Sequence, residues 1–263
     1  MGGSVTISNQ NRNLGDGLVS VGGVWRKITD GWVTTGGVWK QIYSSGLALS
    51  ALPVGTLIKL NESGVGKNFY LACHDYESGL NGAGRTLLVR KDGYKAGAFG
   101  TSANKNKYAT STMDTWHNST YKPMLSARVQ ELMGTTTFYY TPGGGTSGSA
   151  IAVTTLSRSV FQLSVRELGK TSSSYPAEGS ALPIATTLQT CYRDGTTSTA
   201  SQWTRTPAKN NSNAAYTMNA SGGGVTVQYD LTKTNQYRPA FTLPANATVN
   251  PAQNADGSYT LIE

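Results

Sequence analysis

Few side chains in this sequence are of the types that bind metals or act as strong nucleophiles. Cys73 and Cys191 are the only cysteines, and His74 and His117 are the only histidines. Zinc sites usually combine such residues at short fixed spacings, and neither CxxC nor HExxH occurs. We therefore expect two small buried thiols, at most one intramolecular disulfide, and no bound metal or cofactor.

A cysteine nucleophile is the enzymatic alternative. It would need a base within reach and a third group that orients the base. Order in the sequence says nothing about distance in space, so we expect no enzymatic activity and keep the arrangement as a hypothesis. The groups that could supply it are Cys73, His117 and one of Asp75, Asp114 or Asp194.

Two other motifs with known chemistry are incomplete. The segment SGVGKN at 63–68 is similar to a phosphate-binding loop, but its first glycine is at the wrong distance. Asn68 also stands where a serine or threonine would hold magnesium. Asp75, Glu77 and Glu178 fit no recognisable frame for the paired carboxylates of glycoside cleavage. Neither motif supports catalysis.

Composition limits the class of protein. The chain has 263 residues and a formal net charge of +8, yet only 14% of its residues are charged. Disorder through charge repulsion is therefore not expected. Apolar runs stay well below the ~18 residues of a membrane helix, so we expect no membrane insertion. The opening MGGSVTISNQNRN lacks the regions of a secretory signal, which favours the cytosol or assembly into a particle.

Basic residues are densest between residues 85 and 107, where aromatic residues lie among them. Such a mixture can line a nucleic-acid groove. No basic run exceeds two residues, so we favour a solvated face and expect no specific nucleic-acid partner. The residues concerned are Arg85, Arg90, Lys91, Lys95, Lys105 and Lys107, with Tyr94, Phe99 and Tyr108.

An internal repeat opens the chain. VSVGGVWRKI at 19–28 returns as VTTGGVWKQI at 33–42. Each copy alternates apolar and polar residues beside a Gly-Gly pair, which predicts two strands joined by a tight turn. Asp30-Gly31 predicts another turn between the copies. The expected product is a small antiparallel β-meander.

A sheet of this size cannot bury its own tryptophans. We expect the rings to attach the repeat module to a neighbouring subunit or to a larger assembly, or else to pack on the second domain of the chain. These rings are Trp25, Trp32 and Trp39. A linker is expected at 44–55, closing on Pro53.

Beyond the linker, short strands alternate with Gly-rich or polar turns, and three stretches favour helices. One begins at Ser111, with Asp114 in a reciprocal capping arrangement. Another is KPMLSARVQELMG at 122–134, which has a helical apolar spacing and a glycine stop. The third is a short turn at 164–168, capped by Ser164 and Glu167 and ended by a glycine. The pattern predicts an α+β domain.

The segment between Trp203 and Pro239 is rich in Asn, Ser, Thr, Gly and Tyr and poor in carboxylates. This composition is typical of binding loops, where tyrosine supplies contact area and small polar residues adapt their hydrogen bonds. An ordinary solvated hairpin is the alternative. The candidate ligand-binding residues are Lys209, Asn210, Asn211, Asn213, Tyr216, Gln228, Tyr229, Asp230, Thr232 and Lys233.

Four segments carry a resemblance to a known family. KYATSTMDTWHNSTYKPML, SVFQLSVRELG, QWTRTP and YRPAFTL occur in that order. They resemble the Trp-containing helix after Tyr-Ser-x-Ser, the Phe-Leu-Leu-Ser stretch before Glu-Leu, the Trp-Leu-Arg-Ser-Pro and the closing Val-Arg-Pro-Ala of a domain family of uncharacterised function. That family is common in phages, prophages and gut bacteria. The match covers roughly residues 52 to 245.

The resemblance implies a C-type-lectin-like fold related to formylglycine-generating enzymes, with Trp203, Arg205 and Arg238 as framework residues near the binding loops. Some relatives are targets of diversity-generating retroelements, which vary a C-terminal segment like this one. The GGVW repeat likewise resembles modules of phage tail and other virion proteins. The calcium-dependent sugar motifs of true C-type lectins are absent, and Cys191 lacks the nearby partner of the oxidising enzymes, so the fold is expected without that chemistry.

The expected organisation is a β-repeat module over 1–45, a C-type-lectin-like domain with short antiparallel strands and two or three helices over 52–250, and a C-terminal tail over 251–263. The expected function is that of a phage virion protein, at the tail tip or a fibre, that binds a bacterial surface protein or glycan. We expect a homo-oligomer, such as a trimer, joined to other virion proteins through the module. The alternative is a structural or decoration protein that cements capsid or tail subunits.

Overall fold

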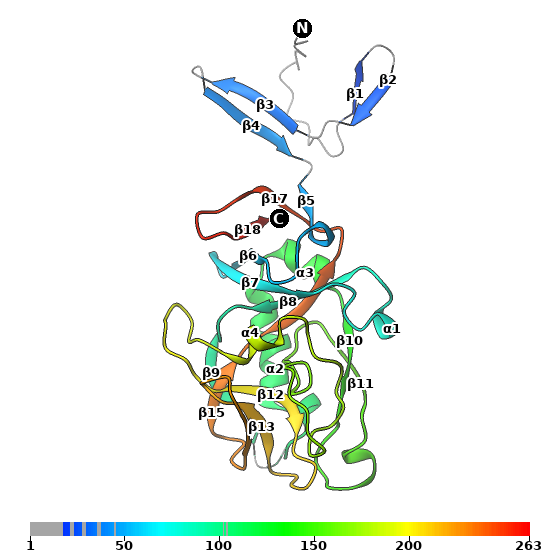
Figure 1. Ribbon diagram of the computed structural model, residues 1–263, viewed down its shortest axis with the longest axis vertical. Helices are drawn as coiled ribbons and strands as arrows, with labels where there is room; N and C mark the ends of the chain where they lie inside the picture. Colours follow the sequence, from blue (N-terminus) through cyan, green and yellow to red (C-terminus); the bar gives the residue numbers. More distant parts are fainter. Residues whose placement is uncertain are drawn as a thin grey trace. The chain divides into compact units, whose positions relative to one another are not determined.

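The computed structural model describes residues 18–21, 24–27, 30–35, 38–44, 46–101, 103 and 105–263, with side chains from residue 46 onward. The chain divides into two compact units, Met1–Gly46 and Leu47–Glu263. Figure 1 shows the elements of each unit. The second unit is a sheet-rich mixed structure with few, short helices.

In the first unit, β1 (Leu18–Val21) pairs antiparallel with β2 (Val24–Lys27), and β3 (Asp30–Thr35) pairs antiparallel with β4 (Val38–Ser44). Each Gly-Gly repeat therefore lies between two paired strands, as the pattern predicts. Among the described residues, the two pairs form separate two-stranded sheets and not one continuous meander.

The predicted turn at Asp30-Gly31 is wrong. Both residues belong to β3, where Asp30 pairs with Ser44 and Gly31 with Tyr43. A register shift follows between Gly31 and Trp32. The long partner strand β4 offers pairing to these residues, so they extend the ladder. The Gly-Gly turns and the side chains of the three tryptophans lie outside the described residues.

A seven-stranded sheet forms one part of the second unit, in the order β16-β8-β7-β6-β18-β17-β5. Its neighbours are antiparallel except for the parallel pair β18 and β6. The segment 251–263, expected as a tail, carries the end of β17 and all of β18, which lies between β6 and β17. The strands are β5 (Leu47–Ala48), β6 (Leu57–Glu62), β7 (Val65–Cys73), β8 (Arg85–Arg90), β16 (Ala240–Pro244), β17 (Thr248–Gln253) and β18 (Tyr259–Leu261).

A five-stranded sheet forms the opposite end of this unit, in the order β14-β13-β12-β15-β9. Here β12 and β15 are parallel and the other neighbours are antiparallel. A separate hairpin joins β10 (Thr136–Tyr140) to β11 (Thr154–Arg158). The five strands are β9 (Lys95–Ala98), β12 (Gln202–Pro207), β13 (Ala215–Met218), β14 (Val225–Gln228) and β15 (Thr234–Tyr237).

The helices are short. The predicted start at Ser111 is confirmed, because its Oγ accepts the Asp114 N–H at 3.0 Å. The reciprocal half of that cap does not form, since the Asp114 carboxylate pairs with Arg158 at 2.9 Å. The helices are α1 (Ser78–Asn81), α2 (Thr112–Trp116), α3 (Ala127–Met133) and α4 (Ala185–Gln189), with 3-10 turns at Leu49–Ala51, Tyr108–Thr110, Lys122–Met124 and Gly148–Ala150 and a π-helix at His117–Tyr121.

The other two predicted helices are shorter than expected. The segment 122–134 begins as a 3-10 turn, and α3 starts only after Ser126, whose Oγ accepts the Val129 N–H at 3.2 Å. The stop at Gly134, with φ of 61°, is confirmed. At 164–168 the chain makes a turn with both capping bonds: Ser164 N–H donates to Glu167 Oε2, and Glu167 N–H donates to Ser164 Oγ. α4 was not anticipated.

A buried ion pair lies at the centre of the second unit. Arg205, on β12, donates to both carboxylate oxygens of Glu167 at 2.6 and 2.9 Å, and both side chains are fully buried. The same guanidinium donates to the backbone oxygens of Tyr139 and Gln162. Burial alone would lower the pKa of Arg205, but Glu167 raises it above its ordinary value. Tyr76 also donates its hydroxyl to Glu167.

Gln162 connects this pair to the other two predicted framework residues. Its side-chain amide donates to Trp203 O at 2.7 Å and accepts the Arg238 N–H at 3.0 Å. Trp203 is itself buried and donates from Nε1 to Gly97 O on β9 at 2.8 Å. Arg238 is buried too, and among the described residues its guanidinium donates to four backbone oxygens, those of Arg90, Lys91, Leu188 and Thr190. These contacts fix the strands that lead to the predicted binding loops.

The buried ion pair gives a stability prediction. Replacing Arg205→Met leaves Glu167 buried without its cation, and we expect a loss of about 3–5 kcal/mol in the free energy of unfolding by urea. Arg128→Met is the control, because Arg128 and Glu131 form an exposed pair worth about 0–1 kcal/mol. The double variant Arg205→Met with Glu167→Leu should recover part of the loss. A cost below ~1 kcal/mol for Arg205→Met would contradict this account.

Candidate functional site

The predicted binding segment divides into buried strands and exposed loop residues. All residues of β12 and β13 are buried. Between and after these strands, Lys209 to Asn213 and Tyr229 to Thr232 include exposed positions, and Tyr229 keeps 67% of its surface. The segment is therefore held by its strands and open to solvent at its loops.

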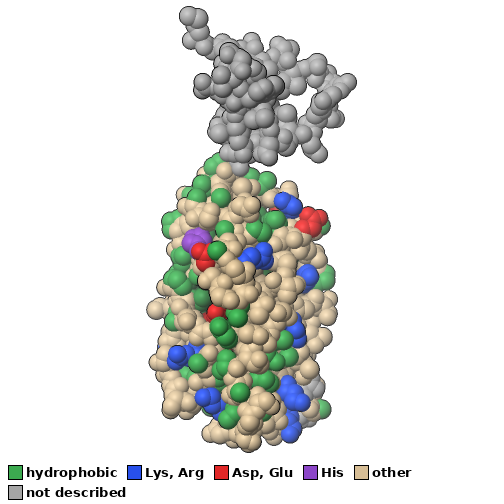
Figure 2. All heavy atoms as spheres, turned by 90° about the vertical axis from the view of Figure 1, so that its right-hand side faces the viewer, with side chains coloured by type: hydrophobic (Ala, Val, Ile, Leu, Met, Phe, Trp, Pro, Cys, Tyr) green, Lys and Arg blue, Asp and Glu red, His purple; other side chains and the backbone are tan. Residues whose placement is uncertain are grey.

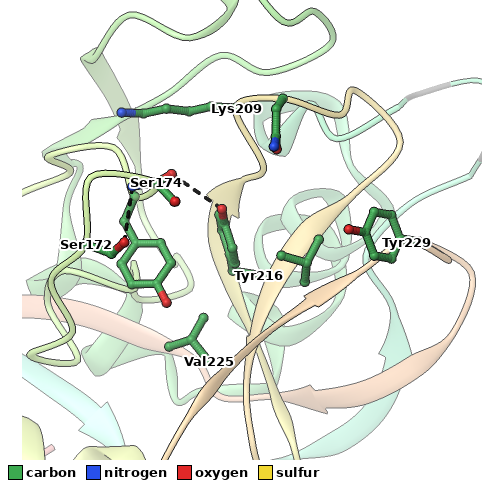
Figure 3. A pocket seen from close by; sticks show the side chains of 9 residues that line it. Ser172, Ser174, Lys209, Tyr216, Val225 and Tyr229 are labelled. Atoms are coloured by element: carbon green, nitrogen blue, oxygen red, sulfur yellow. Dashed lines mark hydrogen bonds between the residues drawn. The ribbon is translucent and has the colours of Figure 1, made fainter.

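A hollow of about 380 Å³ opens beside β13 and β14 (Figure 3). Four of the predicted residues line it: Lys209, Asn210, Tyr216 and Tyr229. The remaining lining residues were not predicted from the sequence. Three of them lie in a Ser-rich loop some 35 residues earlier in the sequence, and two are valines within the predicted segment. These are Ser172, Ser174, Tyr175, Val225 and Val227.

Two tyrosines form one wall of this hollow. The rings of Tyr175 and Tyr216 meet edge to face, with centroids 4.9 Å apart. The Tyr216 hydroxyl donates to Ser174 O at 3.4 Å, which ties β13 to the Ser-rich loop. Burial raises the pKa of Tyr216, so its hydroxyl stays a neutral hydrogen-bonding group. Lys209 is the one charged residue in the lining, which favours a ligand with negative charge.

A second hollow of about 270 Å³ shares Tyr229 with the first. Three predicted residues, Asn213, Asp230 and Thr232, line it together with Leu231. The Asp230 carboxylate accepts the Thr232 hydroxyl at 2.6 Å and the Thr232 N–H at 2.9 Å. Hydrogen bonds from Thr232 hold the pKa of Asp230 below its usual value, so this loop end stays anionic.

The other three predicted residues line neither hollow and instead shape the loops. Asn211 accepts the Asn213 N–H at 2.8 Å, and Gln228 accepts the Asp230 N–H at 3.2 Å. Lys233 takes part in a turn through its N–H, which donates to Asp230 O. These side chains or backbone groups set the loop conformation.

Asn106 supports the backbone of the loop at 209–213, a role that the sequence analysis did not predict. It is fully buried, and its Nδ2 donates to the backbone oxygens of Ala208, Asn211 and Ala214. Its Oδ1 accepts the Gly144 N–H at 2.6 Å. A lone asparagine between two lysines carries no sequence signal for this role, because its partners lie about a hundred residues away.

The basic stretch at 85–107 is solvated only in part: Lys95, Lys105 and Lys107 are exposed, whereas Arg90 is not. Arg90 is buried, pairing with Glu62 and Asp194 at 2.8 and 2.9 Å, and Phe99 and Tyr108 are buried as well. Lys95 lies over the ring of Trp116, 4.8 Å from its centroid. On the face in Figure 2, Lys and Arg side chains are scattered and form no stripe.

The groups of the cysteine-nucleophile hypothesis form no hydrogen-bonded arrangement among the described residues. Burial raises the pKa of the Cys73 thiol to about 12 and also raises that of Cys191, and both thiols are free. His117 is fully buried, and neither ring nitrogen has a hydrogen-bond partner among the described residues. Asp114 binds Arg158, while Asp194 binds Arg90 and Lys67.

Two of the other candidate carboxylates accept hydrogen bonds within the fold. Glu178 is buried and accepts bonds from Thr141 N–H and the Thr206 hydroxyl. Asp75 accepts the Gly84 N–H. In the part of the chain that the structure describes, no three His, Cys, Asp or Glu side chains gather into a metal site. None of its helices has the length and apolar character needed to cross a membrane.

Fold and site together define a sheet-rich protein with two solvent-open hollows at its C-terminal loops. Residues 83–245 match the model of a domain of unknown function (DUF6273), so the chain belongs to that family. The match includes the framework residues and all ten predicted binding residues. No curated protein and no solved structure matches this chain.

The burial of Cys73 gives a prediction about reactivity. Because its pKa is raised to about 12, the thiol should alkylate with iodoacetamide at pH 8 far more slowly than a free cysteine. Mass spectrometry of the folded chain, with the urea-unfolded chain as the control, measures the difference. Rapid labelling of the folded chain would contradict the prediction and revive the nucleophile hypothesis.

The buried His117 gives a prediction about acid stability. Burial lowers its pKa to about 3, below the ordinary value near 6.5, so the unfolded chain binds the proton more readily between these values. The contribution of neutral His117 to the free energy of unfolding is therefore complete above pH 6.5. As the pH falls below this value, the contribution decreases by up to ~1.4 kcal/mol per pH unit. His117→Phe should flatten the pH dependence of unfolding by urea from pH 6.5 to 4. Equal slopes for wild type and His117→Phe would contradict the prediction.

Proposed function

We propose that this chain is a phage virion protein, at the tail tip or a fibre, that recognises a ligand on the bacterial surface. The observation that carries the proposal is the pair of hollows that share the exposed Tyr229. Tyrosine provides contact area at small entropic cost, and the asparagines around it adapt their hydrogen bonds. Seven of the ten predicted residues line one hollow or the other.

The division of labour in this unit supports recognition over catalysis. Buried strands and satisfied polar groups hold the loops, while the loop residues themselves remain open. Binding sites on variable loops above a rigid scaffold follow this arrangement. The thiols and His117 lack the contacts of an activated nucleophile.

The finer parts of the proposal rest on sequence resemblance. We infer a C-type-lectin-like fold for the second unit, in keeping with its short strands and few helices. The Asn-, Ser- and Tyr-rich loops would suit variation by a diversity-generating retroelement. The GGVW repeats would attach the chain to the virion as a homo-oligomer, such as a trimer, so that weak single contacts add up.

The test is binding of the fluorescently labelled full chain to a panel of bacterial strains. We expect Tyr229→Ala and Lys209→Ala each to reduce binding to a recognised strain by roughly tenfold, because each removes a contact in the hollow. Tyr192→Ala is the matched control, since Tyr192 is also exposed but lines a separate hollow with Lys91 and Asp92. The control should bind as wild type does.

The contrary outcome is equally specific. If no strain binds the chain, and deletion of the gene weakens the particle, a structural or decoration role replaces the recognition proposal. If binding occurs but Tyr192→Ala reduces it and Tyr229→Ala does not, the site has been assigned to the wrong surface.

A further inference from the structure

The edge strand β14 presents unpaired backbone groups beside the first hollow. In its register with β13, Thr226 lies opposite Thr217 and Gln228 opposite Ala215. The Asn219 N–H donates to Gly224 O, so hydrogen-bonded pairs recur at every second position from there. Val225 and Val227 fall between those pairs, and their N–H and C=O groups point away from β13.

The other edges of the five-stranded and seven-stranded sheets carry features that limit further pairing, and β14 lacks them. The edge strand β16 exchanges two backbone hydrogen bonds with Phe161, β5 has only two residues, and β9 begins with Lys95. Natural edge strands are usually blunted by such short lengths, cover or charges. β14 reads VTVQ, without charge, proline or register shift.

The side chains of the same two valines line the first hollow and pack in one cluster with Tyr216. An extended chain added to this edge would alternate its side chains across the sheet, and every second one would lie on the face of the hollow. Backbone pairing would then supply affinity while the hollow selects side chains, which is how peptides bind by strand addition.

The positive charge beside the β14 edge favours an acidic polypeptide as the ligand. Lys170 lies at the start of the strand, with its Nζ 3.1 Å from Gly223 O, and Lys209 lines the hollow. The nearby carboxylate, Asp230, lines the second hollow instead. A second copy paired edge to edge would bring the same lysines together, whereas an acidic segment would be attracted.

We propose that β14 binds an extended, acidic polypeptide segment by strand addition, with alternate side chains entering the hollow lined by Tyr216, Val225 and Val227. This rests on the proposed recognition function and names its ligand class as a protein strand in preference to a glycan.

The test compares Val227→Pro with Val227→Thr. Proline removes the outward N–H without touching the ladder to β13, a position where edge strands tolerate it, and threonine keeps that N–H. A yeast-displayed library of random dodecapeptides is selected on the full-length wild-type chain, and the enriched peptides are measured on all three chains. We expect acidic, strand-forming peptides that bind Val227→Thr within about threefold of wild type and Val227→Pro at least tenfold more weakly.

Amide hydrogen exchange keeps the test decisive if the proline variant does not fold. In the free wild-type chain the amides of Val225 and Val227 should exchange fast and that of Thr226 slowly. Adding an enriched peptide should protect Val225 and Val227. Absence of that protection, absence of enriched peptides, or equal binding to folded Val227→Pro overturns strand addition.

Two further outcomes separate this inference from the proposed function. If Tyr229→Ala loses cell binding and Val227→Pro keeps it, recognition stands and strand addition falls. If sedimentation shows a wild-type dimer that Val227→Pro abolishes, the edge belongs to a second copy and the peptide proposal is overturned.

Discussion

The second unit depends on a charge pair that has been removed from water. Arg205 and Glu167 are both fully buried, which is costly unless every donor and acceptor finds a partner. Here the cost is offset by two carbonyl oxygens for the guanidinium and by the Tyr76 hydroxyl and Ser164 N–H for the carboxylate. The pair can exist only when β12, the 164–169 turn and β10 are all in place, so it couples these segments into one arrangement.

Other cations of this chain follow the same principle. The guanidinium of Arg238 donates hydrogen bonds to backbone carbonyls, and that of Arg90 forms ion pairs with Glu62 and Asp194. Among the described residues, Arg90, Arg205 and Arg238 are buried together with the carboxylates Glu62, Asp114, Glu167 and Glu178, so the excess of basic residues remains at the surface. The cations left around the loops, such as Lys170 and Lys209, gain importance since few carboxylates accompany them.

Two buried side-chain amides connect the strands of the second unit to the exposed loops. Gln162 holds Trp203 and Arg238, while Asn106 holds the backbone of the loop that carries Lys209 and Asn210. Because these amides bind backbone oxygens, the loop side chains above them are free to vary without loss of support.

The sequence by itself determined the local features: the paired strands of the Gly-Gly repeats, the Ser111 cap, the Ser164 and Glu167 capping box, and the exposed loops at 209–213 and 229–232. Each depends on residues close in the chain. Only the tertiary structure decided that Asp30-Gly31 extends a strand, that Arg90 is buried, that Ser172 to Tyr175 complete the hollow, and that β14 is an open edge. These outcomes depend on partners distant in sequence, and no local pattern of residue types records which distant group will satisfy a charge or a strand.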